Sequence, residues 1–188
     1  VEGSVKMKKE ISIQSIVLVA LFTALTVIGT TIKIPLPTGA FVHLGNAVLL
    51  LSVLLLGYFK GSLAGGLGFF IFDIMNGYAT EAPYFILESF IVGAAAYAAF
   101  RFFKKNPTHI WQVIVIGIAT GIAKIIMTQV KNTVMNLIAG ASFGPAFAGA
   151  FAKLPATLIN VSLTVLIVAL VYFPLKAAMH RTFRREFV

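Results

Sequence analysis

Six runs of apolar residues, separated by short segments that are polar or contain proline and glycine, constrain the fold of this chain more than any other feature. A helix rises about 1.5 Å per residue, so roughly 20 residues cross a hydrocarbon core of about 30 Å. The runs are of that order, the third being the shortest, and they occupy residues 11–31, 41–58, 61–75, 83–103, 110–138 and 148–178. With 59% of its residues hydrophobic and only 11% charged, the chain lacks the charge that a water-facing surface requires. We predict an all-α membrane protein, a bundle of six transmembrane helices.

The positions of lysine and arginine predict how this bundle is oriented. If the N terminus is cytoplasmic, eleven basic residues fall on the cytoplasmic side and only Lys33 falls on the opposite side. The eleven are Lys6, Lys8, Lys9, Lys60, Arg101, Lys104, Lys105, Lys176, Arg181, Arg184 and Arg185. Because cytoplasmic loops carry an excess of basic residues, we predict that both termini are cytoplasmic. The same bias accounts for the net charge of +9, so we expect no nucleic-acid partner.

The chain is predicted to form one domain. Residues 1–6 (VEGSVK) show no hydropathy pattern, and the MKKEIS that begins at Met7 is typical of a native start. We interpret residues 1–6 as a cloning remnant or a disordered tail, and residues 7–188 as a single six-helix transmembrane domain. The first apolar run is longer than the core of a signal peptide and lacks a convincing cleavage site, so we expect no cleavable signal.

Polar residues form stripes on three of the predicted helices. Side chains at positions i, i+4 and i+7 share one face of a helix. The stripes comprise Lys124, Thr128 and Lys131 with Asn132 and Asn136 beside them, then Lys153, Thr157 and Asn160, and finally Tyr84 and Glu88. A charged side chain at the centre of a bilayer costs about 2.5–3.5 kcal/mol, so such residues normally face the interior of a bundle or a wet cavity. We therefore expect the three stripes to face one another around a cavity that opens outward.

Two interpretations of these buried charges are open. In one, Glu88 and Asp73 merely neutralise the lysines, and the ion pairs fix the packing of the helices. In the other, the polar groups bind a polar small molecule. Three lysines inside the predicted spans face only two acids, and nearby asparagines and threonines add hydrogen-bonding groups that a closed core would struggle to satisfy. This excess favours a ligand.

Two outer loops are predicted to border the cavity. KIPLPTGAFVHLG, residues 33–45, contains two prolines that stiffen the backbone and prevent a helix, so this loop could fold over the mouth of the cavity as a lid. His43 would lie just beneath it, either as a ligand contact or as a local hydrogen-bonding residue. The segment DIMNGYATEAPY places Asp73, Asn76, Tyr78, Glu81 and Tyr84 at the outer face. Tyr84 could stack there on a planar ring or anchor its helix at the membrane interface.

The first predicted helix carries a ridge of small residues, Ala20 and Ala24, which lets another helix approach closely. The ridge could serve internal packing or bind a partner. The sequence contains no G-x-x-x-x-G-K-[ST] phosphate loop, no H-E-x-x-H metal motif and no cysteine, and no serine has an obvious histidine partner. We predict that the chain is not an enzyme, uses no cofactor and no metal, and relies on partners for any ATP-driven step.

These features together resemble the substrate-binding S components of energy-coupling factor (ECF) vitamin transporters, over nearly the whole chain. The resemblance rests on the six runs, the ridge of Ala20 and Ala24, the proline-bearing loop that leads to HLGNA, and LLGYFKGSLAGGLGFFIFDIMNGY. The last two segments are similar to the riboflavin-type branch. The resemblance implies a multi-pass protein of the prokaryotic plasma membrane, with a vitamin bound near its outer surface beneath the first loop. It also implies that Ala20 and Ala24 contact a transmembrane coupling subunit, which two ATPase subunits drive.

The predicted site is richer in polar groups than in aromatic ones. The residues predicted to bind substrate are Lys131, Glu88, Asn132, Tyr84, Lys153, Thr157, Asn160, Thr128, Asn136, His43 and Asp73. Their amides, hydroxyls, amines and carboxylates suit a small ring that bears hydroxymethyl groups, such as pyridoxine or hydroxymethylpyrimidine. A riboflavin-specific S component is one alternative, and riboflavin would require a broader apolar slot. A membrane scaffold or assembly protein without a ligand is the other alternative.

Overall fold

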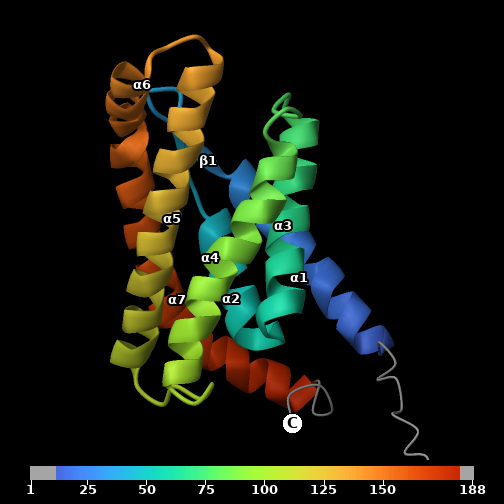
Figure 1. The fold of residues 1–188 in the computed structure, drawn as a ribbon. Coiled ribbons are helices and arrows are strands. Elements are labelled where there is room, and N and C mark those ends of the chain that lie inside the picture. Colours follow the sequence, from blue (N-terminus) through green and yellow to red (C-terminus); the bar gives the residue numbers. More distant parts are fainter. Residues whose placement is uncertain (1–11, 183–188) are drawn as a thin grey trace, which may run out of the picture.

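The computed structural model describes residues 12–182 as a bundle of helices with one short β-hairpin (Figure 1). The helices are α1 (Ile13–Thr31), α2 (Gly45–Leu56), α3 (Tyr58–Met75), α4 (Ala82–Phe102), α5 (Ile110–Ile138), α6 (Phe143–Ala150) and α7 (Leu154–Thr182). The strands are β1 (Lys33–Pro35) and β2 (Phe41–His43), and η1 is a 3₁₀ turn at Phe151–Lys153. Residues 1–6 and the basic residues Lys8, Lys9, Arg184 and Arg185 lie outside the described residues.

The outer surface of the bundle is apolar, as a membrane requires. Each of the six apolar runs overlaps most of one longer helix, and four stretches are long and apolar enough to cross a bilayer: α1, α4, α5 and the segment Phe143–Thr182. Large side chains point outward along these helices; Ile13 is 79% exposed, Ile122 55% and Leu170 62%. Such a surface is unfavourable in water and favourable in lipid. The chain is therefore an all-α membrane protein.

Helix α2 forms the centre of the bundle. Its sequence is apolar on every side, and ten of its twelve residues are buried, between α1, α3, α4 and α7. Glycines let α3 pack closely against its neighbours: a Cβ at Gly61 would come within 2.4 Å of the backbone of Val53, and one at Gly68 within 2.4 Å of Thr26. These glycines of α3 therefore serve internal packing, because any larger residue would push these helices apart.

The predicted second span, residues 41–58, is wrong at its beginning. Residues 41–43 form β2, which pairs antiparallel with β1 so that Lys33 lies opposite His43 and Pro35 opposite Phe41. The prolines of the loop cannot continue a helix, and Gly39 adopts φ 75°, which reverses the chain. The helix that follows has 12 residues, about 18 Å in length, which is too short to span a hydrocarbon core alone.

The predicted sixth span, residues 148–178, is interrupted. Helix α6 ends at Ala150, the turn η1 follows, and α7 begins at Leu154. Pro155 explains the break, because proline fits the first turn of a helix but cannot donate the hydrogen bond that would continue the preceding one. Lys153 therefore lies in the turn that precedes α7, rather than inside a continuous helix as predicted.

The two ends of the bundle differ. In Figure 1 the β-hairpin and α6 lie in the upper half, whereas the connection between α4 and α5 lies at the lower end, as do the start of α1 and the end of α7. Pro174 lies inside α7 and removes one hydrogen bond from the helix ladder. The residues that follow it turn across the lower end of the bundle beneath α2 (Figure 1).

Candidate functional site

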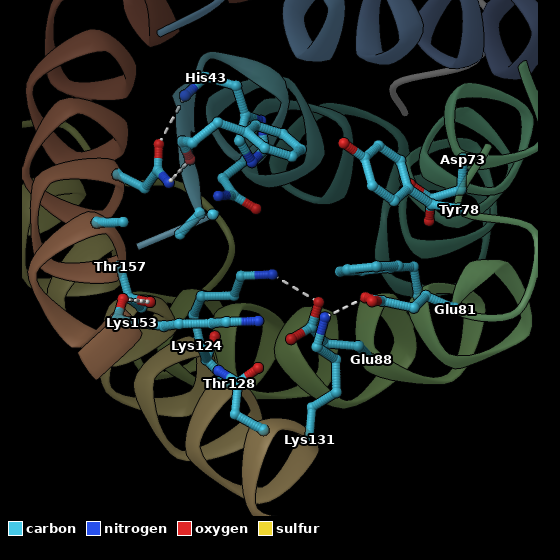
Figure 2. Close-up of a pocket in the computed structure, with 18 residues that line it drawn as sticks. His43, Asp73, Tyr78, Glu81, Glu88, Lys124, Thr128, Lys131, Lys153 and Thr157 are labelled. Carbon is cyan, nitrogen blue, oxygen red and sulfur yellow. Dashed lines mark hydrogen bonds and ion pairs between the residues drawn. The ribbon is translucent and has the colours of Figure 1, made fainter. Parts of the chain in front are cut away.

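A polar cavity of about 150 Å³ lies beneath the β-hairpin, between α3, α4, α5 and α7 (Figure 2). We call it the polar pocket. Nine of the eleven residues predicted to bind substrate line it: His43, Asp73, Glu88, Thr128, Lys131, Asn132, Lys153, Thr157 and Asn160. The structure thus brings the three predicted stripes to one place, because α4, α5 and α7 are neighbours whose polar faces point inward.

Two ion pairs cross the polar pocket between α4 and α5. The Nζ atom of Lys124 lies 2.5 Å from Oε2 of Glu88, and Lys131 pairs with Glu81 (Figure 2). Glu88 is 2% exposed, so its charge needs this partner. The interpretation that acids neutralise the buried lysines is therefore right for Glu88. It is wrong for Asp73, because the acid that pairs with the second lysine, Lys131, is Glu81.

Two charged groups of the polar pocket have no partner among residues 12–182. The ammonium group of Lys153 extends from η1 into the pocket, with no acid or acceptor bonded to it. Asp73 is 5% exposed, and its Oδ2 atom accepts no hydrogen bond. The ion pairs therefore leave one cation and one anion available in the same cavity.

Buried amide groups add to this excess. Asn132 on α5 is 3% exposed, and neither its Nδ2 nor its Oδ1 atom has a hydrogen-bond partner in the described chain. The same is true of Oδ1 of Asn46 at the start of α2. Buried polar groups are nearly always hydrogen-bonded, and one without a partner costs about 1–3 kcal/mol. A molecule in the pocket would satisfy these groups.

Asn160 also has a structural role, which the sequence did not predict. Its Oδ1 atom accepts a hydrogen bond from the backbone N–H of His43 at 2.8 Å, and its Nδ2 donates to the carbonyl of Phe41 at 3.0 Å. The amide thus bonds to β2 as a neighbouring strand would. Asn160 lines the polar pocket, but its main action is to hold the hairpin against α7.

A second contact holds the hairpin on the opposite side. The ammonium group of Lys33 lies over three aromatic rings, 4.9 Å from the ring centroid of Phe72, 5.0 Å from that of Phe41 and 5.7 Å from that of Tyr78. It also donates a hydrogen bond to Oδ1 of Asn76. Attraction between a cation and an aromatic face thus fastens β1 to the end of α3. The hairpin covers the pocket as the predicted lid.

Aromatic rings form walls of the polar pocket, and none of them was among the residues predicted to bind substrate. Phe41, Tyr78 and Phe85 line the cavity, and Phe85 lies within 5.4 Å of the ammonium groups of both Lys124 and Lys131. Residues 81, 85 and 88 repeat the i, i+4, i+7 spacing of a helix face. That spacing could have identified Glu81 and Phe85 once Glu88 was chosen.

Tyr84 and Asn136 do not line the polar pocket, contrary to prediction. The hydroxyl of Tyr84 lies 2.8 Å from the carbonyl oxygen of Met127 and 3.1 Å from Oε1 of Glu88, so it supports the Glu88 carboxylate from behind. Asn136 donates to the carbonyl of Ala146 at 2.9 Å and joins α5 to α6. Both residues act on the structure around the pocket rather than on its contents.

The polar pocket offers groups that can bind a polar molecule. Its donors and acceptors come from lysine, asparagine, threonine and acidic side chains, and its walls offer ring faces. Among residues 12–182, no three histidine, cysteine or acidic side chains are grouped so that they could hold a metal ion. A planar ring with polar substituents matches this combination of groups.

His43 is expected to make the stability of the fold depend on pH. It lies in β2, outside the helices, where burial together with the charges of Lys124 and Lys33 lowers its pKa from 6.5 to about 3. The neutral ring accepts a hydrogen bond from the N–H of Gly45 at Nδ1. Because the folded state disfavours the protonated ring, this stabilisation is complete above about pH 6.5 and is lost as the pH falls toward 3.

The variant His43→Asn tests this pH dependence, because asparagine can accept the same hydrogen bond in an Asx turn but carries no titratable group. We expect the melting temperature of the wild type to fall more than that of His43→Asn between about pH 7 and about pH 4.5. Equal decreases in the two proteins would show that His43 does not carry the effect.

A second cavity lies on the lipid-facing side of α1 and α3. It is an apolar groove of about 890 Å³, and its lining includes both Ala20 and Ala24. These alanines are exposed and thus take no part in internal packing, which was one of the two roles considered for them. Figure 1 shows α1 and α3 on the side of the bundle away from α5 and α7. The groove is therefore separate from the polar pocket.

Comparison with known families gives a match over most of the chain. Residues 10–180 match the family model described as ECF-type riboflavin transporter, S component. The matched residues include every residue that lines the polar pocket and the apolar groove. No match to the chain was found among curated proteins.

Proposed function

The chain belongs to the ECF-type riboflavin transporter S component family, and from this premise we propose that its polar pocket binds a vitamin or vitamin precursor with a single ring. S components are vitamin-binding subunits of transporters and not enzymes. The proposed ligand is pyridoxine-like or hydroxymethylpyrimidine-like. The chain would capture it outside the cell and deliver it inward with ATPase partners.

The volume of the polar pocket favours a ligand with a single ring. The cavity measures about 150 Å³. Protein cavities of roughly that volume bind one benzene ring. A three-ring system with a sugar-alcohol chain is several times larger than benzene and would require the hairpin and the aromatic walls to move apart. A single substituted ring fits the pocket with the hairpin in place.

The unpartnered groups explain why hydroxymethyl substituents would be recognised. A hydroxyl group can donate one hydrogen bond and accept another. Oδ2 of Asp73 and Oδ1 of Asn46 can accept the donated bond, whereas Lys153 and the Nδ2 group of Asn132 can donate to the hydroxyl oxygen. The rings of Phe41 and Phe85 would contact the faces of the ligand. These same unpartnered groups make a ligand-free scaffold the weaker alternative.

Riboflavin is the second candidate, because the description of the matching family names it. Isothermal titration of the purified chain in detergent distinguishes the two proposals. We expect saturable binding of pyridoxine or hydroxymethylpyrimidine, with riboflavin at least a hundredfold weaker. Tight binding of riboflavin, with no heat from the single-ring compounds, would overturn the assignment in favour of the riboflavin alternative.

The proposed orientation places the polar pocket on the outside of the membrane. Within the described residues, the basic side chains Lys60, Arg101, Lys104, Lys105, Lys176 and Arg181 belong to helix ends and a connection at the lower end of Figure 1. An excess of basic residues marks the cytoplasmic side. We accordingly propose that both termini are cytoplasmic and that the chain crosses the prokaryotic plasma membrane six times.

The apolar groove is the proposed contact with the transport machinery. Ala20 and Ala24 are exposed at its surface, and small residues let a second helix approach the backbone closely. The proposed occupant is a helix of the transmembrane coupling subunit, which two ATPase subunits drive. Family membership supports this choice, since an S component acts with an energy-coupling module.

A further inference from the structure

The ionisable residues of the bundle are separated by sign. Among residues 12–182 the acidic side chains are Asp73, Glu81 and Glu88, and all three line the polar pocket. At the lower end, Lys105 and Lys176 therefore have no acidic partner within the described chain. Charges of one sign that lack counter-ions create a field that attracts ions of the opposite sign.

A cavity of about 270 Å³ opens within this basic end, between the end of α2, the end of α4 and the last turns of α7. We call it the basic pocket. Three basic side chains line it, Lys105, Lys176 and His180. The leucines at the end of α2 also line it, as do the rings of Tyr97 and Tyr172. Lys176 and His180 follow Pro174 in α7, and they line this pocket together with the residues that end α2.

The two lysines are positioned by contacts that leave their charges uncompensated. The Nζ atom of Lys176 donates to Oδ1 of Asn106 at 2.6 Å and lies 5.7 Å from the ring centroid of Tyr172. The Nζ atom of Lys105 lies 5.3 Å from the ring centroid of Tyr97. An amide oxygen and two neutral rings hold the ammonium groups in place without neutralising them.

The backbone at Lys105 supports a role for this side chain. Lys104 and Lys105 have φ values of 54° and 58°, in the left-handed region where glycine is favoured. The N–H of Lys105 donates to the carbonyl of Phe100 at 2.9 Å and closes the end of α4. Glycine would close this turn with less strain. This turn fixes the backbone from which the Lys105 side chain extends to the ring of Tyr97.

Stabilisation of the end of α2 is the competing explanation for these lysines. The last carbonyl groups of a helix carry partial negative charge, and nearby cations stabilise them. However, neither Lys105 nor Lys176 donates a hydrogen bond to a carbonyl of α2 within the described residues. Stabilisation of the end of α2 therefore does not account for the positions of these two ammonium groups.

We propose that the basic pocket binds the phosphate group of an anion at the cytoplasmic membrane surface. Basic pockets between membrane helices on the cytoplasmic side are suited to lipid headgroups, because the ammonium groups contact the phosphate and the apolar wall contacts the first part of the acyl chains. Free inorganic phosphate offers the same oxygen atoms without the chains. The site is independent of the vitamin bound at the other end of the bundle.

Native mass spectrometry of the full chain tests this proposal. The protein is titrated with phosphatidylglycerol and, separately, with phosphatidylcholine of the same acyl chains. We expect a preference for phosphatidylglycerol in the wild type and a loss of about thirtyfold in its affinity in Lys105→Gln plus Lys176→Gln, since each lysine near a headgroup contributes on the order of fivefold. The matched control, Arg101→Gln plus Lys104→Gln, removes the same charge at the same end outside the pocket and should keep the preference.

Competition with excess inorganic phosphate separates the two sources of the phosphate group. If phosphate does not displace phosphatidylglycerol, the site recognises lipid; if it does, and the pocket variant no longer responds to it, the site recognises phosphate itself. Equal losses in the pocket variant and the control would mean that charge alone attracts lipid, and the proposal would be wrong. The absence of any preference in the wild type would contradict it as well. Retained vitamin binding shows that the variants are folded.

Discussion

Replacing Glu88 with alanine is expected to abolish vitamin binding by the purified chain. The Glu88 carboxylate is 2% exposed and lies 2.5 Å from the Nζ atom of Lys124. Without it, the Lys124 ammonium loses its counter-ion and must turn to other acceptors in the polar pocket. Removing one partner of a buried ion pair costs about 3–5 kcal/mol of stability. If this cost falls on ligand binding, the affinity decreases by more than a hundredfold.

Lys131→Ala is expected to have the same effect from the other ion pair. The Lys131 ammonium lies 5.0 Å from the ring centroid of Phe85 and pairs with Glu81. Its removal leaves Glu81 without a counter-ion and leaves Phe85 without one of the two cations that hold its ring. The aromatic wall of the polar pocket would then be mobile where the ligand requires a fixed surface.

Conservative variants separate binding from folding in this test. Glu88→Gln keeps the shape of the side chain and an acceptor for Lys124, and Lys131→Met keeps the length of the lysine stem. We expect both variants to elute as folded protein in size-exclusion chromatography. In isothermal titration, their affinity for the vitamin should be at least tenfold lower than that of the wild type. Arg101→Gln, which removes a charge far from the pocket, should bind normally. Unchanged affinity in Glu88→Ala and in Lys131→Ala would exclude the polar pocket as the vitamin site.

The double variant Ala20→Trp plus Ala24→Trp is expected to bind the vitamin normally and to stop transport. Both alanines are exposed in the apolar groove, which is separate from the polar pocket. Two indole groups would fill the surface on which a partner helix must approach the backbone closely. The fold should tolerate them, because they point away from the buried core. Uptake of labelled vitamin by proteoliposomes that also contain the coupling subunit and the ATPases measures the effect.

Leu21→Trp plus Leu25→Trp is the matched control for this prediction. Leu21 and Leu25 have the same spacing on α1 and are 48% and 40% exposed, but they do not line the groove. This control should transport at the wild-type rate. Normal transport by the alanine variant would show that the groove is not the contact with the coupling subunit.

The helical bundle and much of the polar pocket could be predicted from the sequence, because the membrane imposes strong patterns. Apolar runs mark helices, and a charged residue such as Lys124 or Glu88 inside a run must face the interior. Helical spacing then places Thr128, Lys131 and Asn132 beside Lys124. The period of a helix and the cost of burying charge are enough to place these residues.

The hairpin and the break before α7 could not be predicted in the same way. Strands β1 and β2 have three residues each, which is too short for an alternating pattern to appear, and β2 is fixed by Asn160, 117 residues away from His43 in the chain. Similarly, the pairing of Lys131 with Glu81 depends on how the start of α4 lies against α5. Such contacts follow from packing between distant segments, which hydropathy does not record.

Asn132 offers the most direct test of the claim that a single-ring ligand completes the polar pocket. Its buried amide has no partner in the described chain, so Asn132→Leu should leave the protein at least as stable as the wild type while removing two of the groups that hold the ligand. The neighbouring Thr133 is buried but lies outside the pocket, which makes Thr133→Val the matched control. The measurement is mass spectrometry of the small molecules that co-purify with each protein. We expect a single-ring vitamin or precursor with the wild type and with Thr133→Val, and none with Asn132→Leu. Equal retention by all three proteins would show that the polar pocket does not hold such a ligand.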